Sequence, residues 1–545
     1  QAQVIVDFDA NFMQDHPTSL RNSKQFSAGR KPEEGHMNRL YVYENTFSIT
    51  GGMADHRFPT AHGDIAAAVW ALAAELVLGE GLPLPSDAGI TRSQLNRFKG
   101  HKAGGEHIAA VAKDLMDHRG HGLLLAGLRQ DPDTHALVQV LNTALGNVGH
   151  AISFLPIEAP RVRFVDELVH ELNAGHIETL VVLDSNPAYS APADLKFAEA
   201  MQKAQTRIHL GHREDATAKL STWHLPMAHF LESWGDAMAW DMSYLAVQPL
   251  IAPLYGGKTV TEILSLMADE APRDSYGITR DAFDLMTGGS GSAPADEPAF
   301  EKKWRAFIHD GFLKGSGQDH GQTLALAGTA LEVPRDAGDL GPDNLEISFL
   351  HDQSVFDGRY ADNAWLQEMP DFMSKLTWDN AALFSPSTAE ELGLKHGDLV
   401  ELDYQGRKLE MAVYVLPGQA KYAVTVNLGY GREDAGRVGN GAGFDTYKLR
   451  TWDHLHGGPG LKVSKTGKSY ELATTQDHHA IDEAGAQEIQ KRVPNLVREG
   501  NIQDDKNDPE FVDHLGVHSP PLASLWKEWE YTGYKWGMAV DLNAC

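Results

Sequence analysis

Two loops of the sequence carry carboxylate and amide side chains directly after strand-like apolar runs. Their members are Asp9, Asn11, Asp184 and Asn186. Loops at the carboxyl ends of parallel strands are where open α/β sheets bind nucleotides. An aspartate in such a loop opposes a pyrophosphate, which is bound best by bare backbone amides. The alternative is that both are ordinary strand-to-helix loops with aspartate and asparagine turn chemistry.

Histidine is the residue type that could bind a metal, with 26 in the chain. The closest clusters are His454 with His456 and His478 with His479. Neither cluster has a third ligand nearby in sequence, so hydrogen-bonded or exposed histidines are expected there instead of a metal site. The sequence contains no nucleophile elbow, no phosphate-binding P-loop and no His-Glu-x-x-His motif. A Ser-His-Asp triad with dispersed members stays open.

The single cysteine, Cys545, follows a strand-like stretch over residues 537–544. One cysteine excludes a disulfide framework and any cysteine-rich metal site within this chain. In bacterial-type ferredoxin modules, a strand of this kind leads into the run of cysteines that binds an iron–sulfur cluster. Cys545 is therefore interpreted as a cluster ligand, with an ordinary free thiol as the alternative.

The elements that would position these residues alternate between strands and helices over the first two thirds of the chain. Strands are predicted at residues 4–8, 39–43, 122–127 and 179–183, and helices at residues 64–78, 107–116, 134–145 and 165–173. Apolar residues on both faces of a strand indicate a parallel sheet with helical crossovers. Asp64 is the predicted N-cap of its helix. Residues 287–294, rich in glycine and serine, predict a linker or a surface loop.

From residue 381 the pattern changes to short strands separated by tight turns, which predicts a small β-barrel. Its clearest strands are residues 399–402, 409–415 and 423–426. The predicted organisation is an α/β domain over 1–100, a second over 101–335, a barrel over 336–515 and an aromatic tail over 516–545.

Composition limits the possible functions. A chain of 545 residues with 47 basic and 75 acidic side chains has a formal charge of −28. Such a chain repels phosphates, which argues against a nucleic-acid-binding role. The longest apolar run, residues 65–74, is shorter than the ~18–20 residues that cross a bilayer. No transmembrane segment is therefore expected.

Four stretches, in this order along the chain, resemble the catalytic-subunit fold of the molybdopterin oxidoreductases. They are Met53–Asp64 with its Ala-Asp, Phe-Pro and Gly-Asp steps, Gly122–Gly149, Asn186–Gly235 and Trp365–Asp398, which Leu472–His478 extends. Each motif is loose alone, but their order is specific and covers almost the whole chain. The chain most resembles the molybdopterin-like domain of the iron–sulfur B subunit of alternative complex III, a quinol-oxidising bacterial complex. In that branch a ferredoxin-like domain follows, and residues 537–545 look like its start.

The resemblance implies two Rossmann-like parallel α/β domains and a C-terminal double-psi-type β-barrel, which holds a dinucleotide in active members. It implies a non-catalytic domain of an electron-transfer subunit on the periplasmic side of the inner membrane. Quinol would be oxidised at membrane subunits. Electrons would pass through 4Fe–4S and 3Fe–4S clusters of the fused ferredoxin-like domain to haem c subunits and a periplasmic cytochrome c or oxidase. Cys545 would be one cluster ligand.

The same resemblance implies that this branch holds no molybdopterin. Asp9 stands where pterin-binding members place glycine. The resemblance assigns the vestigial pterin-cleft loops to Asp9, Asn11, Asp184, Asn186 and Asn440. An iron–sulfur cluster and a molybdenum ligand of typical members would lie before Gln1. One alternative is an active bis-pterin enzyme of the polysulfide or dimethyl-sulfoxide reductase type, with Asn11, Asn186 and Asn440 as cofactor contacts. Another is a vestigial cleft that binds a different small ligand.

Overall fold

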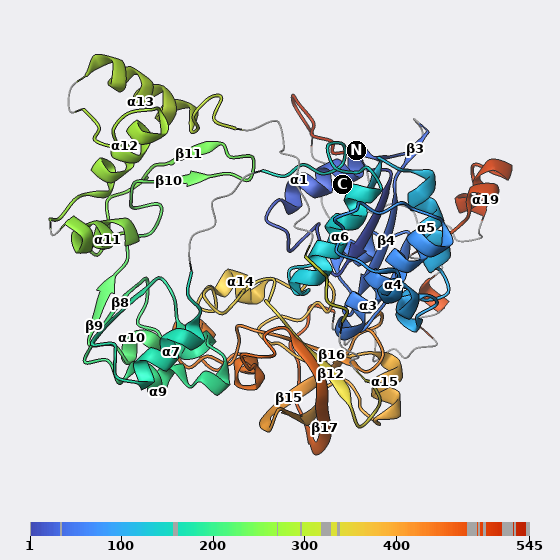
Figure 1. The fold of residues 1–545 in the computed structure, drawn as a ribbon. Coiled ribbons are helices and arrows are strands. Elements are labelled where there is room, and N and C mark those ends of the chain that lie inside the picture. The colour runs from blue at the N-terminus through green and yellow to red at the C-terminus, as the bar shows by residue number, and fades with distance from the viewer. Residues whose placement is uncertain are drawn as a thin grey trace. The chain divides into compact units, whose positions relative to one another are not determined.

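Figure 1 shows the fold, taken from a computed structural model of the chain. The structure describes residues 2–32, 35–155, 162–269, 271–294, 297–317, 329–334, 338–476, 488, 491–493, 497–514, 527 and 530–540. The chain divides into one compact unit from Gln1 to Ala473 and a second that begins at Thr474. Each unit is described by itself.

The first sheet is parallel throughout, with the strand order β5-β4-β1-β6. The strands are β1 (Val4–Phe8), β4 (Arg39–Glu44), β5 (His56–Pro59) and β6 (Gly122–Ala126). The predicted strands at residues 4–8, 39–43 and 122–127 are confirmed. Because β6 pairs with β1, the sheet includes residues beyond position 100, where the sequence suggested a boundary.

Helices cover both faces of this sheet, so every residue of β1 is buried. The helices and short strands of this part are α1 (Ser19–Ala28), β2 (Arg30–Lys31), β3 (His36–Met37), α2 (Ile49–Gly52), α3 (His62–Ala74), α4 (Arg92–Phe98), α5 (Ile108–Asp117) and α6 (Pro132–Ala144). Val4, Val6 and Phe8 pack in a cluster with α3, α5 and α6, whereas Ile5 packs against Phe26 of α1 on the other face.

The predicted N-cap of α3 is wrong. The helix begins at His62, and its N-cap is Ala61, which makes no side-chain cap bond. Asp64 lies in the first turn, where a carboxylate still favours the helix dipole. A π-helical turn, Glu75–Gly79, continues α3. The combined segment His62–Gly79 is long and apolar enough to span a membrane, but 61% of it is buried in the fold, as expected of a core helix.

The second parallel sheet has three strands in the order β7-β8-β9. The elements of this part are α7 (Val165–Asn173), β7 (Thr179–Leu183), α8 (Pro187–Ser190), α9 (Phe197–Met201), β8 (Thr206–Gly211), α10 (Ala216–Lys219) and β9 (Trp223–Pro226). The predicted helix at 165–173 and strand at 179–183 are confirmed. Leu172, Leu180 and Met201 belong to the apolar cluster that joins the helices to the sheet.

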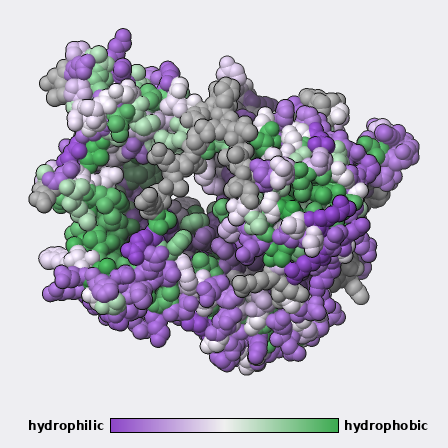
Figure 2. Space-filling model, in the orientation of Figure 1, coloured by the Kyte–Doolittle hydropathy of each residue, from purple (hydrophilic) through white to green (hydrophobic). Residues whose placement is uncertain are grey.

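A helical extension follows this sheet. It contains β10 (Gly235–Met238), β11 (Tyr244–Val247), α11 (Val260–Asp269), α12 (Ser275–Met286) and α13 (Pro298–Asp310). Phe283, Trp304 and Phe307 form its core. The glycine- and serine-rich residues 287–294 connect α12 to α13. Figure 2 shows hydrophobic side chains gathered at the surface between α11 and β9, where Leu264 and Trp223 are exposed.

A closed six-stranded barrel follows, with the order β12-β16-β13-β15-β14-β17. Its strands are β12 (Leu345–Leu350), β13 (Ala382–Phe384), β14 (Asp398–Tyr404), β15 (Arg407–Val415), β16 (Ala423–Asn427) and β17 (Gly457–Ser469). Short helices α14 (Ala364–Glu368), α15 (Pro386–Glu391) and α16 (Gly436–Gly439) lie between strands. Both parallel and antiparallel pairs occur. Parallel α/β sheets together with this mixed barrel confirm the predicted fold class.

The second unit contains α19 (Ile502–Asn507) and α20 (Phe511–His514). Residues 530–540 have no helix or strand, and Tyr534 and Trp536 are fully exposed at 100% and 99%. The predicted cluster ligand Cys545 and the tail residues Trp526 and Trp529 lie outside the described residues.

Candidate functional site

The two loops singled out by the sequence share one backbone construction. Asp9 follows β1 and Asp184 follows β7, and both have a left-handed backbone, at φ 62° and 49°. This conformation favours glycine, and aspartate is one of the few other residues that adopt it readily. Each aspartate therefore occupies a position that glycine would fit sterically.

Both loops also share a hydrogen-bonding pattern two residues later. Thr50 donates its hydroxyl to Asn11 Oδ1 at 2.9 Å, and Thr217 donates to Asn186 Oδ1 at 2.8 Å. Each hydroxyl also accepts the backbone N–H two residues beyond its asparagine, at 3.1 Å in both loops. Both threonines are fully buried. The side-chain carbonyl oxygens of both asparagines are therefore occupied by hydrogen bonds within the loops.

In the first loop the Asp9 carboxylate is enclosed by side chains from two neighbouring elements. Arg129 Nη2 donates to Asp9 Oδ1 at 2.6 Å, and Gln130 Nε2 donates to Oδ2 at 3.1 Å. The His62 ring, at the start of α3, lies 3.5 Å from Oδ2. Burial opposes ionisation of Asp9, but the charge of Arg129 and hydrogen bonds from His62 and Arg129 outweigh it and lower its pKa. Asp9 is therefore a buried, ionised carboxylate whose charge is balanced by Arg129.

Arg129 links this loop to the barrel. Its Nη2 also donates to Asn45 Oδ1 at 2.9 Å, and Asn45 Nδ2 donates to Thr425 Oγ1 on β16 at 3.3 Å. Gln419 donates to the same hydroxyl at 2.9 Å. Arg129 Nη1 is buried and has no hydrogen-bond partner among the described residues. A polar network thus runs from the end of β1 to the outer surface of the barrel.

A second carboxylate, Glu346 on β12, occupies the N-terminus of α3. Its Oε1 accepts the backbone N–H of His62 at 2.6 Å, and its Oε2 accepts that of Gly63 at 2.7 Å. Glu346 is fully buried, and burial raises its pKa, while the His62 charge and the two N–H groups oppose the shift. The anion position that a helix N-terminus creates is therefore filled by the protein itself.

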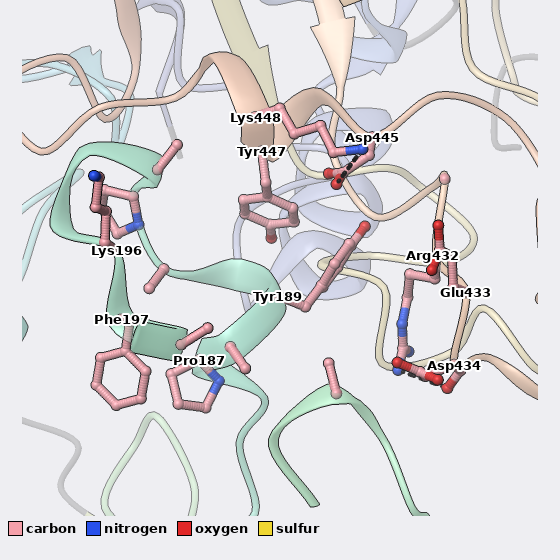
Figure 3. Close-up of a pocket in the computed structure, with 17 residues that line it drawn as sticks. Pro187, Tyr189, Lys196, Phe197, Arg432, Glu433, Asp434, Asp445, Tyr447 and Lys448 are labelled. Atoms are coloured by element: carbon pink, nitrogen blue, oxygen red, sulfur yellow. Dashed lines mark hydrogen bonds and ion pairs between the residues drawn. The ribbon is translucent and has the colours of Figure 1, made fainter. Parts of the chain in front are cut away.

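The second loop is open by contrast. Asp184 is exposed, and its carboxylate accepts no hydrogen bond from the part of the chain that the structure describes. A cavity of about 370 Å³ lies beside this loop (Figure 3). The aromatic residues Tyr189, Phe197 and Tyr447 line it, and the rings of Tyr189 and Tyr447 meet edge to face with centroids 4.9 Å apart. An aromatic ring of a ligand would find packing partners here.

The charges around this cavity balance. The charged lining residues are Lys196, Arg432, Lys448, Glu433, Asp434 and Asp445. Arg432 is held by the carbonyls of Gly358 at 2.5 Å and Asp434 at 3.1 Å, and Lys448 lies 3.7 Å from Asp445. Burial raises the pKa of Asp445 to about 6, and its Oδ1 has no partner among the described residues. The cavity has no excess positive charge for phosphates.

The structure brings the predicted residues together in pairs. Asp9 lies with Asn11, and Asp184 lies with Asn186, whose Nδ2 is buried without a partner in the described part of the chain. Asn440 lies in a barrel loop and accepts the backbone N–H of Ala435 at 2.7 Å. It does not line the cavity beside the second loop. Within the described ranges no three histidine, cysteine or carboxylate side chains group as metal ligands.

Sequence reasoning missed the partners that fill the first loop. Arg129 and Gln130 follow β6, and β6 lies beside β1 in the sheet. Because the carboxyl ends of parallel strands meet at one edge, the strand at 122–127 was a usable signal for them. Glu346 had no such signal, since 284 residues separate it from His62.

The sheets, the two strand-end loops and the barrel together define a molybdopterin oxidoreductase-like fold. Among solved structures, the chain is similar to acetylene hydratase from Pelobacter acetylenicus, with a TM-score of 0.55 and 14% sequence identity over 85% of this chain and 78% of that one. No family profile and no curated protein matches the chain. At this identity the likeness shows the fold alone.

The residues of the first loop do not fit a pterin dinucleotide. Its phosphates would need free donors, whereas Arg129 Nη2 and Gln130 Nε2, which follow β6, are bonded to Asp9, and the first N–H groups of α3 are bonded to Glu346. A Cβ at Gly127, beside the same loop, would collide with the backbone carbonyl of Asp9, so the chain is tightly packed here. The cavity beside the second loop has room for a ring system, but its cations are matched by carboxylates.

Proposed function

We propose that this chain is the non-catalytic, molybdopterin oxidoreductase-like domain of an iron–sulfur electron-transfer subunit in a quinol-oxidising complex of the alternative complex III type. The observation that carries the non-catalytic part is the pair of buried carboxylates, Asp9 and Glu346. They accept hydrogen bonds from Arg129 Nη2, Gln130 Nε2 and the first two N–H groups of α3, so these donors are not available to cofactor phosphates.

The electron-transfer part of the proposal rests on the order of the sequence stretches and on the approach to Cys545. Quinol would be oxidised at membrane subunits, and electrons would reach a periplasmic acceptor through iron–sulfur clusters and haem c subunits. The thiolate of Cys545 would bind cluster iron in the fused ferredoxin-like domain. The described domain would support this path mechanically on the periplasmic side of the membrane.

One observation favours a second candidate, an active bis-pterin enzyme of the polysulfide or dimethyl-sulfoxide reductase type. The cavity beside the second loop has the size and aromatic lining of a small-molecule site. This candidate requires the same openness at the first loop, where Arg129 and Gln130 are already bonded to Asp9. We therefore favour the non-catalytic role.

Purification of the full-length natural protein from the membranes of its host tests the electron-transfer role. We expect it to co-purify with haem c and iron and to catalyse quinol-dependent reduction of cytochrome c. The variant Cys545→Ser should lose part of the low-temperature electron paramagnetic resonance signal of its clusters, with a substitution at an exposed serine, Ser86→Ala, as the control. A protein that purifies alone, without iron or haem, would contradict the role.

A further inference from the structure

Glu346 makes an unusual contact for a strand residue. It lies on the first half of β12, yet both of its carboxylate oxygens accept backbone N–H groups from α3, at 2.6 and 2.7 Å. Distances this short are typical of charge-assisted hydrogen bonds. The helix has 13 residues and its N-cap, Ala61, supplies no side-chain bond. Glu346 is therefore the cap of a helix that lies 284 residues earlier in the chain.

Further polar atoms without hydrogen-bond partners lie near Glu346, where β12 of the barrel meets α3 and its neighbours. Ser348 is two residues beyond Glu346 on β12, so both side chains lie on one face of the strand. The Ser348 hydroxyl is fully buried and has no partner in the described chain. Ser348 pairs across the sheet with Thr425, which the Asn45 amide links to Arg129 and its unpartnered Nη1. Two buried donors, the Ser348 hydroxyl and Arg129 Nη1, and one buried acceptor, Gln419 Oε1, therefore have no partner in the described chain.

We infer that the α3 N-terminus and the facing side of β12 form a binding site for a small oxyanion, a carboxylate or a phosphate, which the chain fills with Glu346. The side chain acts as an internal ligand that joins the first α/β sheet to the barrel. It supplies the negative charge that the helix N-terminus favours, without a ligand that can dissociate. This inference rests on the proposed non-catalytic role, in which no external anion is needed at this position.

Removal of the internal ligand is expected to create a site for an external one. The variant Glu346→Ala deletes the carboxylate and one methylene, which leaves space beside the N–H groups of His62 and Gly63. We expect its melting temperature to fall below that of the wild type and to rise again by about 2 °C or more, saturably, with added formate. Inorganic phosphate is the second probe, and sodium chloride at equal ionic strength is the reference for both.

Glu346→Gln is the matched control. The amide fills the same space without the charge, so we expect lower stability than the wild type and no specific response to formate. The wild type should respond to formate as it does to chloride. Equal melting temperatures of Glu346→Ala in formate and chloride would overturn the inference. If this variant is recovered only by refolding from urea, equal recovery in the two salts, including none in both, overturns it as well.

The result is separable from the test of the proposed function. Molybdenum and pterin in the wild-type protein would refute the non-catalytic role whatever the variants do. A protein without either group whose Glu346→Ala variant ignores formate would keep the non-catalytic role and refute the internal ligand.

Discussion

The loops after β1 and β7 have the same local construction and opposite surroundings. Each has a left-handed aspartate, then an asparagine bonded to a buried threonine. Asp9 is enclosed by Arg129 and Gln130, whereas Asp184 is exposed, and residues of α8, directly after its loop, line a cavity of about 370 Å³ that Asp184 itself does not line. The difference shows that neighbouring elements, and not the loop itself, determine whether such a strand end remains open for a ligand.

The largest expected effect separates the two aspartates. Asp9→Ala leaves the Arg129 guanidinium buried and without its carboxylate, which should lower the free energy of unfolding by about 3–5 kcal/mol. Asp184→Ala is the matched control, and because it removes an exposed carboxylate, we expect a change within about 0.5 kcal/mol. Urea unfolding followed by circular dichroism measures both. Equal losses for the two variants would remove the contrast between the loops.

A pH-dependent effect is expected at the strand that leads into the first loop. Asp7 on β1 is fully buried, and burial raises its pKa to about 8, although the Ala10 N–H opposes the shift. Between the ordinary value of 3.8 and about 8, the folded protein holds a proton that the unfolded chain releases. Stability should therefore fall as the pH rises through this range, by up to about 1.4 kcal/mol per unit.

Asp7→Asn removes this titration. The variant should lose less stability than the wild type between about pH 5 and about pH 8, as measured by urea unfolding at each pH. Asp184→Asn is the control, and its profile should follow that of the wild type. Parallel profiles for Asp7→Asn and the wild type would show that Asp7 does not carry the proton.

An intermediate and equal effect is expected at the threonines that the loops share. Thr50→Ala and Thr217→Ala each remove the hydroxyl bond to the asparagine carbonyl, which keeps only the threonine N–H, and leave one buried backbone N–H without a partner, at a cost of about 1–3 kcal/mol. Thr50→Ser and Thr217→Ser keep the hydroxyl and should retain most of that stability. Urea titrations of the four variants compare the loops directly. A loss at only one threonine would show that the common construction is not equally important.

The smallest effect is expected from filling the open cavity. Ala216 lines it, so Ala216→Leu places apolar atoms in existing space, and we expect a change in the free energy of unfolding within about 1 kcal/mol. A smaller enlargement at the first loop, Gly127→Ala, collides with the Asp9 carbonyl and should cost about 1–3 kcal/mol. Thermal unfolding of both variants gives the comparison. A larger loss for Ala216→Leu than for Gly127→Ala would mean that the second loop is the more tightly packed one.

The strands and helices of the described core were predictable because their signals are local. The strand at 4–8 is apolar except for Asp7, and Gly175 follows closely after the helix at 165–173. The N-cap of α3 was not predictable, because its hydrogen-bond acceptor, Glu346, comes from a barrel strand far along the chain. Local composition favoured Asp64, which the structure places in the first turn.

The position of the candidate site was predictable from the sequence, but whether each of its aspartates is buried or exposed was not. Asp9 and Asp184 were both recognisable as strand-end residues, and nothing in either loop distinguishes a buried aspartate from an exposed one. That distinction depends on Arg129, which reaches Asp9 only because β6 lies next to β1. The cluster-ligand prediction for Cys545 concerns a residue outside the described part of the chain, and it remains a prediction.

The metal and pterin content of the purified, full-length natural protein tests the central claim most directly. Elemental analysis and the fluorescence of oxidised pterin are measured on the same sample. The account predicts iron without stoichiometric molybdenum, tungsten or pterin, because Asp9 and Glu346 already occupy the donors of the first loop. Stoichiometric molybdenum or tungsten with pterin would contradict it.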